Sequence, residues 1–282
     1  QPDTKNLEKK VDELAKNQQK MMEMLAKGGG AAPAAAQRPQ RREPDRSKVY
    51  AVEGGPVIDV ARELAVANGF EDRIEFLRGW SMELGLPEPA DVLISETIGN
   101  AGFNEGIVAW AFDARQRLLR PGAALIPQRL RLWVAPVENF EDHELVSGWQ
   151  SPHLPYDFTA ASERAACTLW FGDLTPEHLL GQGAVAADVD LASAPYEKIT
   201  SAGELQVDRD GTLHGLACWF DCLLSPGVIV HNMPPRGESS WSHGFLPLAE
   251  AIEVSAGDRF RWELSVSADG EDWNWELQPV EG

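Results

Sequence analysis

Apolar and polar positions follow one another in a heptad-like order near the start of the chain. Between residues 7 and 25, mostly apolar residues recur at alternating spacings of four and three, with charged residues between them. This pattern is typical of a short heptad helix. Three glycines at 28–30 interrupt it, and a tract rich in Ala, Pro and Arg follows, which has the composition of a flexible linker. We predict a short amphipathic or coiled-coil helix at 1–27 and a linker at 28–47. Because the pattern is only three heptads long, a solvated helix is favoured over an oligomerisation helix.

From residue 48 the pattern changes to short apolar runs that alternate with amphipathic stretches. The runs at 48–53, 73–79 and 91–96 predict strands, and the 3.6-residue periodicity at 56–70 and 107–120 predicts helices. Strands that are apolar throughout and are separated by helices are typical of a parallel sheet covered on both faces. We therefore predict an α/β domain at residues 48–130.

After about residue 130 the helical periodicity largely disappears. Runs such as 227–232, 252–256 and 260–268 have the composition of antiparallel strands. We predict an all-β domain at residues 131–282, with the shape of a barrel or a sandwich.

The charge of the chain restricts its partners. The formal net charge is -19, and because residues 1–50 carry 11 Lys/Arg against 7 Asp/Glu, the remaining chain stands at -23. Such a field repels nucleic-acid phosphates and attracts basic peptides. No apolar run approaches the roughly 18 residues that span a bilayer, so we expect neither a nucleic acid nor a membrane as partner.

Three cysteines supply neither a disulfide framework nor paired zinc-binding arms. We expect a reduced, cytoplasmic protein without a metal and, since the chain opens on Gln1, without a targeting segment. Cys218 and Cys222 lie four apart in an apolar strand, so we expect both on one face as small buried residues.

Acidic residues stand where the predicted parallel strands end, which is where open sheets bind ligands. Glu53 ends the first strand, where it would bind ribose hydroxyls or simply cap the following turn. Glu96 ends the third strand, and Glu105 follows nine residues later, before a helix. Two carboxylates that converge on one cleft suit the planar fork of a guanidinium. The alternative is a helix-capping glutamate beside an unrelated strand-end charge.

Four segments carry a resemblance to a known family: KVYAVE, NGFEDRIEFLRG, LPEPADVLISETIGNAGFNE and ARQRLLRPGAALIP. In order and spacing they resemble the protein arginine methyltransferases, which are class I S-adenosylmethionine enzymes. In that family a double-glutamate loop has its two glutamates nine residues apart, as Glu96 and Glu105 are here. The later segments GTLHGLACWFDCLLSPG and NMPPRGESSWSHGF are similar to barrel strands and a substrate-pocket loop of the family. The resemblance covers about residues 48–282 and implies a Rossmann-like methyltransferase sheet followed by an all-β, barrel-like domain.

The resemblance also implies a role for each candidate residue. The residues that would bind the cofactor ribose and adenine are Glu53, Ser81, Met82 and Glu83. The catalytic pair that would grip the guanidinium is Glu96 and Glu105, and the substrate-pocket residues are Trp241 and His243. The implied cofactor is S-adenosyl-L-methionine. The implied reaction is methyl transfer to a guanidinium or similar cationic nitrogen, on a basic arginine-containing peptide or a small cationic molecule, with a homodimer as a further alternative.

The sequence departs from the family at the cofactor site. The glycine-rich turn that should precede residue 48 by about twenty residues is missing, and the Ala/Pro/Arg tract takes its place. Met82 stands where many members have Glu. We therefore predict that residues 1–48 are an unrelated leader and that the sheet is incomplete at its N-terminal strand. A catalytically inactive or truncated protein that acts as a binding module is the alternative function.

The substrate side departs from the family as well. Ser239 and Ser240 replace the Thr and His that precede the tryptophan corresponding to Trp241. Thr97 and Asn100 stand in the double-glutamate loop where Trp and Tyr are common. These changes favour a third alternative, in which the methyl acceptor is a small amine.

Overall fold

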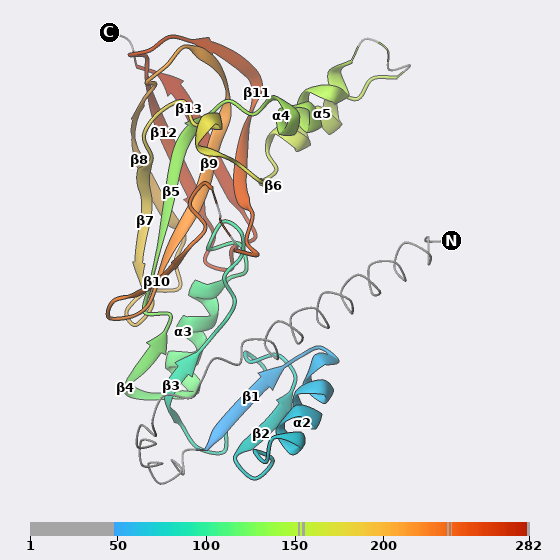
Figure 1. Cartoon of the computed structure of the whole chain (residues 1–282), viewed down its shortest axis with the longest axis vertical. Coiled ribbons are helices and arrows are strands. Elements are labelled where there is room, and N and C mark those ends of the chain that lie inside the picture. The colour runs from blue at the N-terminus through green and yellow to red at the C-terminus, as the bar shows by residue number, and fades with distance from the viewer. Residues whose placement is uncertain (1–47, 152, 154–155, 236, 238, 281–282) are drawn as a thin grey trace, which may run out of the picture. The chain divides into compact units, whose positions relative to one another are not determined.

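The computed structural model describes residues 48–280, apart from 152, 154, 155, 236 and 238 (Figure 1). Apart from Lys48, the described residues belong to one compact unit that begins at Val49. The helix predicted at 1–27 and the linker predicted at 28–47 lie outside the described residues. The boundary predicted at residue 130 stays a prediction.

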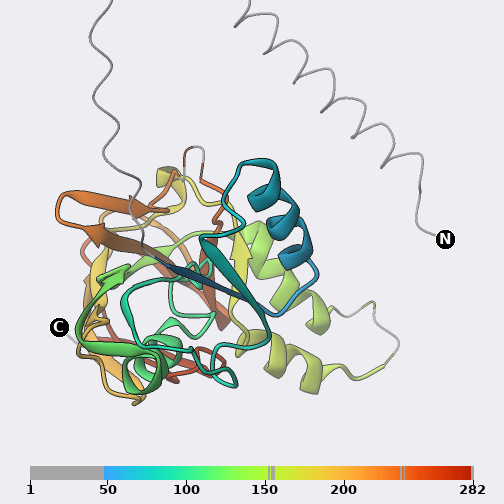
Figure 2. The ribbon, with the colours of Figure 1, turned by 90° about the horizontal axis from the view of Figure 1, so that it is seen from below.

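Two strand–helix–strand units form the first part of the fold. The first consists of β1 (Val49–Glu53), α2 (Val57–Ala67) and β2 (Ile74–Arg78). The second consists of β3 (Ala90–Ile94), α3 (Ile107–Arg117) and β4 (Leu119–Ile126). Each pair of strands is parallel, and α2 packs along the β1–β2 pair (Figure 2). These elements confirm the strands and helices predicted from the apolar runs.

Helix α2 begins and ends where its sequence indicates. Pro56 precedes the helix, a position that suits the fixed φ of proline and its missing N–H. Gly69 follows the helix with φ 72°, a left-handed conformation that glycine adopts without steric cost. The Leu64 carbonyl accepts from the Asn68 backbone N–H at 3.1 Å and from the Asn68 side-chain amide at 2.8 Å, so Asn68 closes the last turn of the helix.

The two parallel strand pairs do not hydrogen-bond to each other within the described chain. Each of β1 and β3 therefore has one unpaired edge. Apolar side chains of β3 remain exposed, with Val92 at 49% and Ile94 at 75% of full exposure. In a continuous parallel sheet such residues are covered on both faces. The absence of an N-terminal strand stays a prediction.

Two antiparallel sheets form the second part of the fold. The larger has the order β6-β11-β9-β5-β7, with β10 paired to β9, and the smaller has the order β13-β12-β8. The strands are β5 (Arg129–Val137), β6 (Trp170–Gly172), β7 (Ala184–Asp190), β8 (Ile199–Gln206), β9 (Gly211–Ser225), β10 (Val228–His231), β11 (His243–Val254), β12 (Arg259–Val266) and β13 (Trp273–Pro279). No hydrogen-bonded ladder between described strands closes the two sheets into one barrel. The prediction of antiparallel strands after residue 130 is confirmed.

The main core lies along one face of β9 and β5. On β9, Cys218, Phe220 and Cys222 alternate into this core and are fully buried. Burial raises the pKa of both thiols to about 12, so the two cysteines act as the apolar residues that the sequence predicted. Trp219 and Asp221 lie out of phase with them and so belong to the opposite face of the strand.

Short helices interrupt the strands and correct the prediction of an all-β region at 131–282. They are α4 (Phe140–Ser147), η1 (Gly148–Gln150), α5 (Thr159–Ala166) and η2 (Pro176–His178). Figure 1 shows α4 and α5 extending from one end of the larger sheet. Their sequences, FEDHELVS and TAASERAA, are too short and polar to show an apolar stripe, and both helices pack against β11. Tertiary contacts therefore determine these helices.

Candidate functional site

The segment 95–105, here called the double-glutamate loop, leaves β3, folds back on itself and leads into α3. An antiparallel bridge joins Gly99 to Gly102, and the Gly102 N–H donates to the Gly99 carbonyl at 2.8 Å. The Asn104 side chain accepts from the Ala101 N–H at 2.8 Å. The loop is therefore closed by its own backbone, which turns the chain back on itself between Glu96 and Glu105.

Glu96 and Glu105 lie close enough to influence each other. Although much of the Glu105 side chain is exposed, the loop shields part of its carboxyl group from water. This loss of solvation raises the pKa of Glu105, and the negative charge of Glu96 raises it further. A cation bound between the two carboxylates would offset both effects.

Two tethers hold the double-glutamate loop against the antiparallel sheets. The Trp241 indole N–H donates to the Ile98 carbonyl at 2.8 Å. The Asn100 side-chain oxygen accepts from the Ser242 N–H at 2.9 Å. Trp241 also packs edge-on against Phe220, with ring centres 5.4 Å apart and planes at 81°. The sequence predicted Trp241 as a site residue, and the structure places it directly behind the loop.

Asn232 joins the loop to two further segments. Its side chain is fully buried and uses both amide atoms. The oxygen accepts from the Phe220 N–H at 2.8 Å, and the nitrogen donates to the carbonyls of Asn100 at 2.8 Å and Ser242 at 2.6 Å. No pattern in the sequence identified this residue, because a single asparagine in a loop carries no periodic signal.

Glycines allow the start of α3 to touch the turn between β12 and β13. Gly106 precedes α3 with φ 74°, and a Cβ there would lie 2.7 Å from the Asp269 carbonyl oxygen. Gly270 faces the Phe103 carbonyl just as closely from the other side. Any larger residue at these positions would push the double-glutamate loop away from the sheets.

Glu53 lies exposed at the end of β1, as predicted. One of its carboxylate oxygens accepts from the Gly55 N–H at 2.5 Å, so the residue caps the turn that follows the strand. Of the two roles that the sequence left open, capping of the turn and ribose binding, this contact is the turn cap. It engages one oxygen and leaves the ribose-binding role as a prediction.

The predicted adenine-side residues Ser81, Met82 and Glu83 form a turn after β2. The Arg117 guanidinium on α3 donates to the carbonyls of Ser81 and Leu84, both at 2.9 Å. The structure thus ties this turn to the helix that begins directly after Glu105.

A tryptophan pair that the sequence analysis missed links the cofactor-side and substrate-side candidates. The rings of Trp80 and Trp110 stack with centres 6.4 Å apart and planes at 14°. The Trp110 indole N–H donates to the Glu105 carbonyl at 2.9 Å. A Cβ on Gly54, directly after Glu53, would lie 3.6 Å from the Trp80 ring. One signal for this pair is present in the sequence: Trp80 directly precedes the candidate residues 81–83, and Trp110 follows Glu105 by five residues.

Comparison with known families assigns the chain. The model of the arginine methyltransferase oligomerization subdomain matches residues 128–276, which is more than half of the sequence. The chain belongs to the protein arginine methyltransferase family. The resemblance noted from the double-glutamate spacing is confirmed.

Individual relatives agree with this assignment. Protein arginine N-methyltransferase PRMT10 of Oryza sativa subsp. japonica is 30% identical over 254 residues, covering 78% of this chain and 67% of that protein. Protein arginine N-methyltransferase 6 of Danio rerio is 25% identical, covering 78% and 66%. The arginine N(omega)-methyltransferase of Streptomyces achromogenes is 26% identical, covering 78% and 62%. The chain thus spans about two thirds of the length of the curated relatives it matches.

Two solved structures share the fold. The Trypanosoma brucei PRMT1 enzyme–prozyme heterotetrameric complex with AdoHcy superimposes with a TM-score of 0.72 at 23% identity, covering 83% of this chain and 77% of that one. Protein arginine methyltransferase 10 of Arabidopsis thaliana gives 0.65 at 20% identity, covering 83% and 82%. At these identities the likeness establishes a common fold.

The second substrate-side residue inferred from the methyltransferase resemblance, His243, lies away from solvent. It is fully buried at the start of β11, and its Nδ1 accepts from the Leu174 N–H at 2.9 Å. His243 therefore does not share the solvent-exposed surface on which Glu105 lies. Its role in substrate binding stays a prediction.

Two classes of feature are not found among the described residues. No helix there is long and apolar enough to cross a bilayer. That part of the chain also holds no group of three or more His, Cys, Asp or Glu side chains placed to bind a metal ion.

The shifted pKa of Glu105 leads to a testable pH dependence of stability. A carboxyl group whose pKa is raised by folding binds more protons in the folded state than in the unfolded state, so its contribution to stability grows as the pH falls. Glu105→Gln removes this titration. We expect the variant to melt about 1–3 °C above the unsubstituted chain at pH 8, and we expect the difference to shrink toward pH 5.

Thermal melts across this range test the expectation. Glu63→Gln on the exposed face of α2 is the matched control and should leave the melting temperature unchanged. If the difference in melting temperature between Glu105→Gln and the unsubstituted chain stayed constant from pH 8 to pH 5, folding would not raise the pKa of Glu105.

Proposed function

We propose that this chain is an S-adenosylmethionine-dependent arginine N-methyltransferase in which Glu96 and Glu105 bind the substrate guanidinium. The observation that supports this most is the double-glutamate loop: two carboxylates, of which Glu96 raises the pKa of Glu105, at the ends of a closed loop that Trp241 and Asn232 fasten to the sheets. Relatives that are 26–30% identical to the chain are named as methyltransferases of arginine, in proteins or as arginine itself.

The glutamate pair acts on the charge of the acceptor. An arginine guanidinium has a pKa above about 12, so it arrives protonated, with its charge spread over three nitrogens. Carboxylates that hydrogen-bond two of these nitrogens concentrate the positive charge there and leave more electron density on the third. Glu105 must be ionised to do this, and its raised pKa returns toward the ordinary value once the cation binds. Much of the remaining gain is positional, because an in-line displacement needs the attacking nitrogen held at the methyl group.

The described residues fit part of the cofactor. When bound, S-adenosylmethionine supplies an electrophilic methyl group. Glu53, exposed at the end of β1, would hold the ribose, and the turn at 81–83 would hold the adenine. We propose that the two strand pairs belong to one Rossmann-like sheet whose unpaired edges on β1 and β3 mark the place of a further strand. No described segment stands there to cradle the amino-acid end of the cofactor.

The net charge of the chain indicates the kind of substrate, and the matched family model indicates the kind of assembly. The charge of -23 over residues 51–282 suits a basic, arginine-containing peptide, and a small guanidinium compound is the other acceptor of the same chemistry. The matched family model describes an oligomerization subdomain, and one neighbour in fold is a heterotetrameric complex. Both observations support an oligomer, and the homodimer is the form that we propose.

Calorimetric titration with S-adenosylhomocysteine tests the cofactor half of the proposal. We expect saturable binding that Glu53→Ala weakens about 10- to 100-fold, the effect of losing a charge-assisted hydrogen bond. Glu63→Ala, on the exposed face of α2, should bind like the unsubstituted chain. The absence of saturable heat at millimolar ligand would remove the enzymatic function from this chain and leave a binding module.

A further inference from the structure

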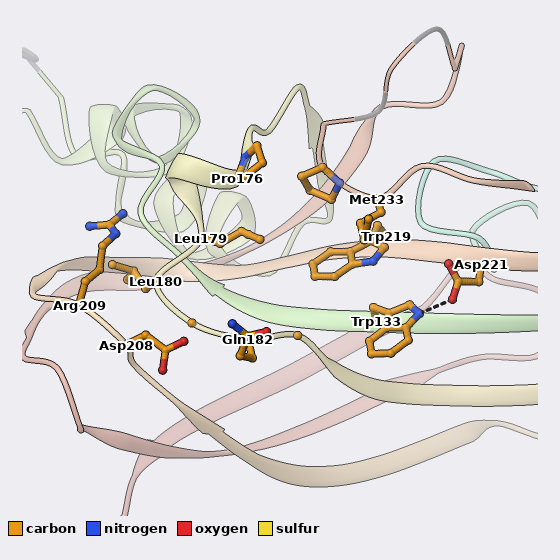
Figure 3. A pocket seen from close by; sticks show the side chains of 13 residues that line it. Trp133, Pro176, Leu179, Leu180, Gln182, Asp208, Arg209, Trp219, Asp221 and Met233 are labelled. Carbon is orange, nitrogen blue, oxygen red and sulfur yellow. Dashed lines mark hydrogen bonds between the residues drawn. The ribbon is translucent and has the colours of Figure 1, made fainter.

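A cavity of about 490 Å³ opens on the face of β9 that points away from the double-glutamate loop (Figure 3). Trp219 and Asp221 line it. Phe220, between them in the strand, points to the opposite face, where a Cβ on Gly102 of the loop would lie 3.1 Å from it. A ligand in this cavity would therefore be separated from Glu96 and Glu105 by the sheet itself.

Two parallel indole rings form much of the cavity wall. Trp133 on β5 and Trp219 on β9 are cross-strand neighbours, with ring centres 6.4 Å apart and planes at 4° (Figure 3). The segment before β7 approaches so closely that a Cβ on Gly183 would lie 2.8 Å from the Trp219 ring. Within the described chain, the Trp219 indole N–H donates to no side chain or carbonyl. The wall thus offers apolar ring faces and one hydrogen-bond donor.

The cavity also carries negative charge that no described residue neutralises. Asp221 accepts from the Trp133 indole N–H at 2.9 Å through one oxygen and forms no ion pair with a described residue. Asp208 lines the far end. Arg209 lines the cavity too, but its guanidinium is bound by the Glu138 carboxylate at 2.6 Å. A ligand that enters the cavity therefore meets two carboxylates, Asp221 and Asp208, that form no ion pair with a described residue.

The chain already combines a guanidinium with this ring system. The Arg131 guanidinium lies 5.9 Å from the centre of the Trp133 ring and donates to the Asp188 carboxylate at 2.8 Å. A guanidinium over an aromatic face is attracted by the ring quadrupole, and a carboxylate in its plane adds paired hydrogen bonds. Asp221, which lies across from Arg131 in the β5–β9 register, and the Trp219 ring offer the same two kinds of partner to a second guanidinium.

We propose that this cavity binds an arginine side chain of an extended peptide, at a place separate from the glutamate pair. The guanidinium would lie against the indole rings and donate to Asp221, and the Trp219 N–H would donate to a carbonyl of the peptide backbone. The volume lies within the range of pockets that enclose one small ligand, about 300–1,000 Å³. The negative body of the protein attracts such a peptide. The inference does not depend on methyl transfer.

Binding of a short peptide without cofactor tests this inference. The probe is acetyl-Gly-Gly-Arg-Gly-Gly-amide, and its neutral counterpart carries citrulline in place of arginine. The Glu96→Gln/Glu105→Gln background suppresses binding at the glutamate pair. We expect saturable binding of the arginine peptide, at least tenfold weaker binding of the citrulline peptide, and at least a tenfold loss in Asp221→Asn. The asparagine oxygen still accepts from Trp133, so this variant removes the charge and keeps the local hydrogen bond.

The control and a second readout make the outcome decisive. Glu63→Gln removes a carboxylate on the exposed face of α2, outside the cavity wall, and it should leave the affinity unchanged. In the nuclear magnetic resonance spectrum of the unsubstituted chain, the Trp219 indole signal, assigned with Trp219→Phe, should shift on addition of the peptide. Equal affinity for the citrulline peptide, which would indicate a neutral stacking ligand, would overturn the inference. So would an unchanged affinity in Asp221→Asn or an unmoved Trp219 signal.

Discussion

Replacing Asn232 with leucine is expected to lower the free energy of unfolding by about 3 kcal/mol. The two side chains are similar in size, so the loss comes from hydrogen bonds and not from a cavity. The buried amide serves the Phe220 N–H and the carbonyls of Asn100 and Ser242. Leucine would leave these three backbone groups without their partner in a place that water does not reach. Urea denaturation of both proteins measures the difference.

The same substitution should loosen the double-glutamate loop before the whole protein unfolds. Hydrogen exchange of the Gly102 and Phe103 amides, which close the loop, should accelerate in Asn232→Leu. Asn68→Leu is the matched control, since its amide makes one exposed hydrogen bond at the end of α2, and its cost should stay below about 0.5 kcal/mol. An Asn232→Leu variant as stable as the control would show that the loop is held by other contacts.

Neutralising the glutamate pair is expected to produce the largest loss of activity. With an arginine peptide as acceptor, Glu96→Gln and Glu105→Gln should each lower kcat/KM by about 100-fold or more, since each removes a charge-assisted hydrogen bond that strengthens as charge moves in the transition state. The double variant should be little worse than either single one, because the two carboxylates hold one guanidinium as a unit.

Steady-state rates with matched controls measure this effect. Glu144→Gln, exposed on α4, removes the same charge at a distance and should retain full activity. Melting temperatures establish that each variant is folded. A decrease of less than fivefold in both single variants would mean that the pair does not bind the guanidinium.

The first half of the fold could be predicted from the sequence because its signals are local. Short apolar runs identify the strands, and Pro56 and Gly69 bracket the helix between the first two of them. Helices α4 and α5 gave no such signal. Each has only eight residues, so contacts with β11 from far along the chain decide their conformation.

Site residues could be predicted where their spacing in the sequence is characteristic. They could not be predicted where their position depends on tertiary packing. The nine-residue interval between Glu96 and Glu105, with two glycines and two asparagines between them, identified the loop. Asn232 and the stacking of Trp80 on Trp110 depend on which segments meet in space. The burial of His243 against the Leu174 N–H has the same origin, since the pairing of β11 with β6 brings those segments together.

The most direct test of the proposed function is transfer of a labelled methyl group from S-adenosylmethionine to an arginine peptide, followed by hydrolysis and amino-acid analysis. We expect label on the guanidinium nitrogens of arginine, and at least 100-fold less label with the Glu96→Gln/Glu105→Gln variant. A lysine peptide of the same length should remain unlabelled. A folded chain that binds both cofactor and arginine peptide yet transfers no label, or one that labels the peptide equally well without the two carboxylates, would contradict the proposed role of the glutamate pair.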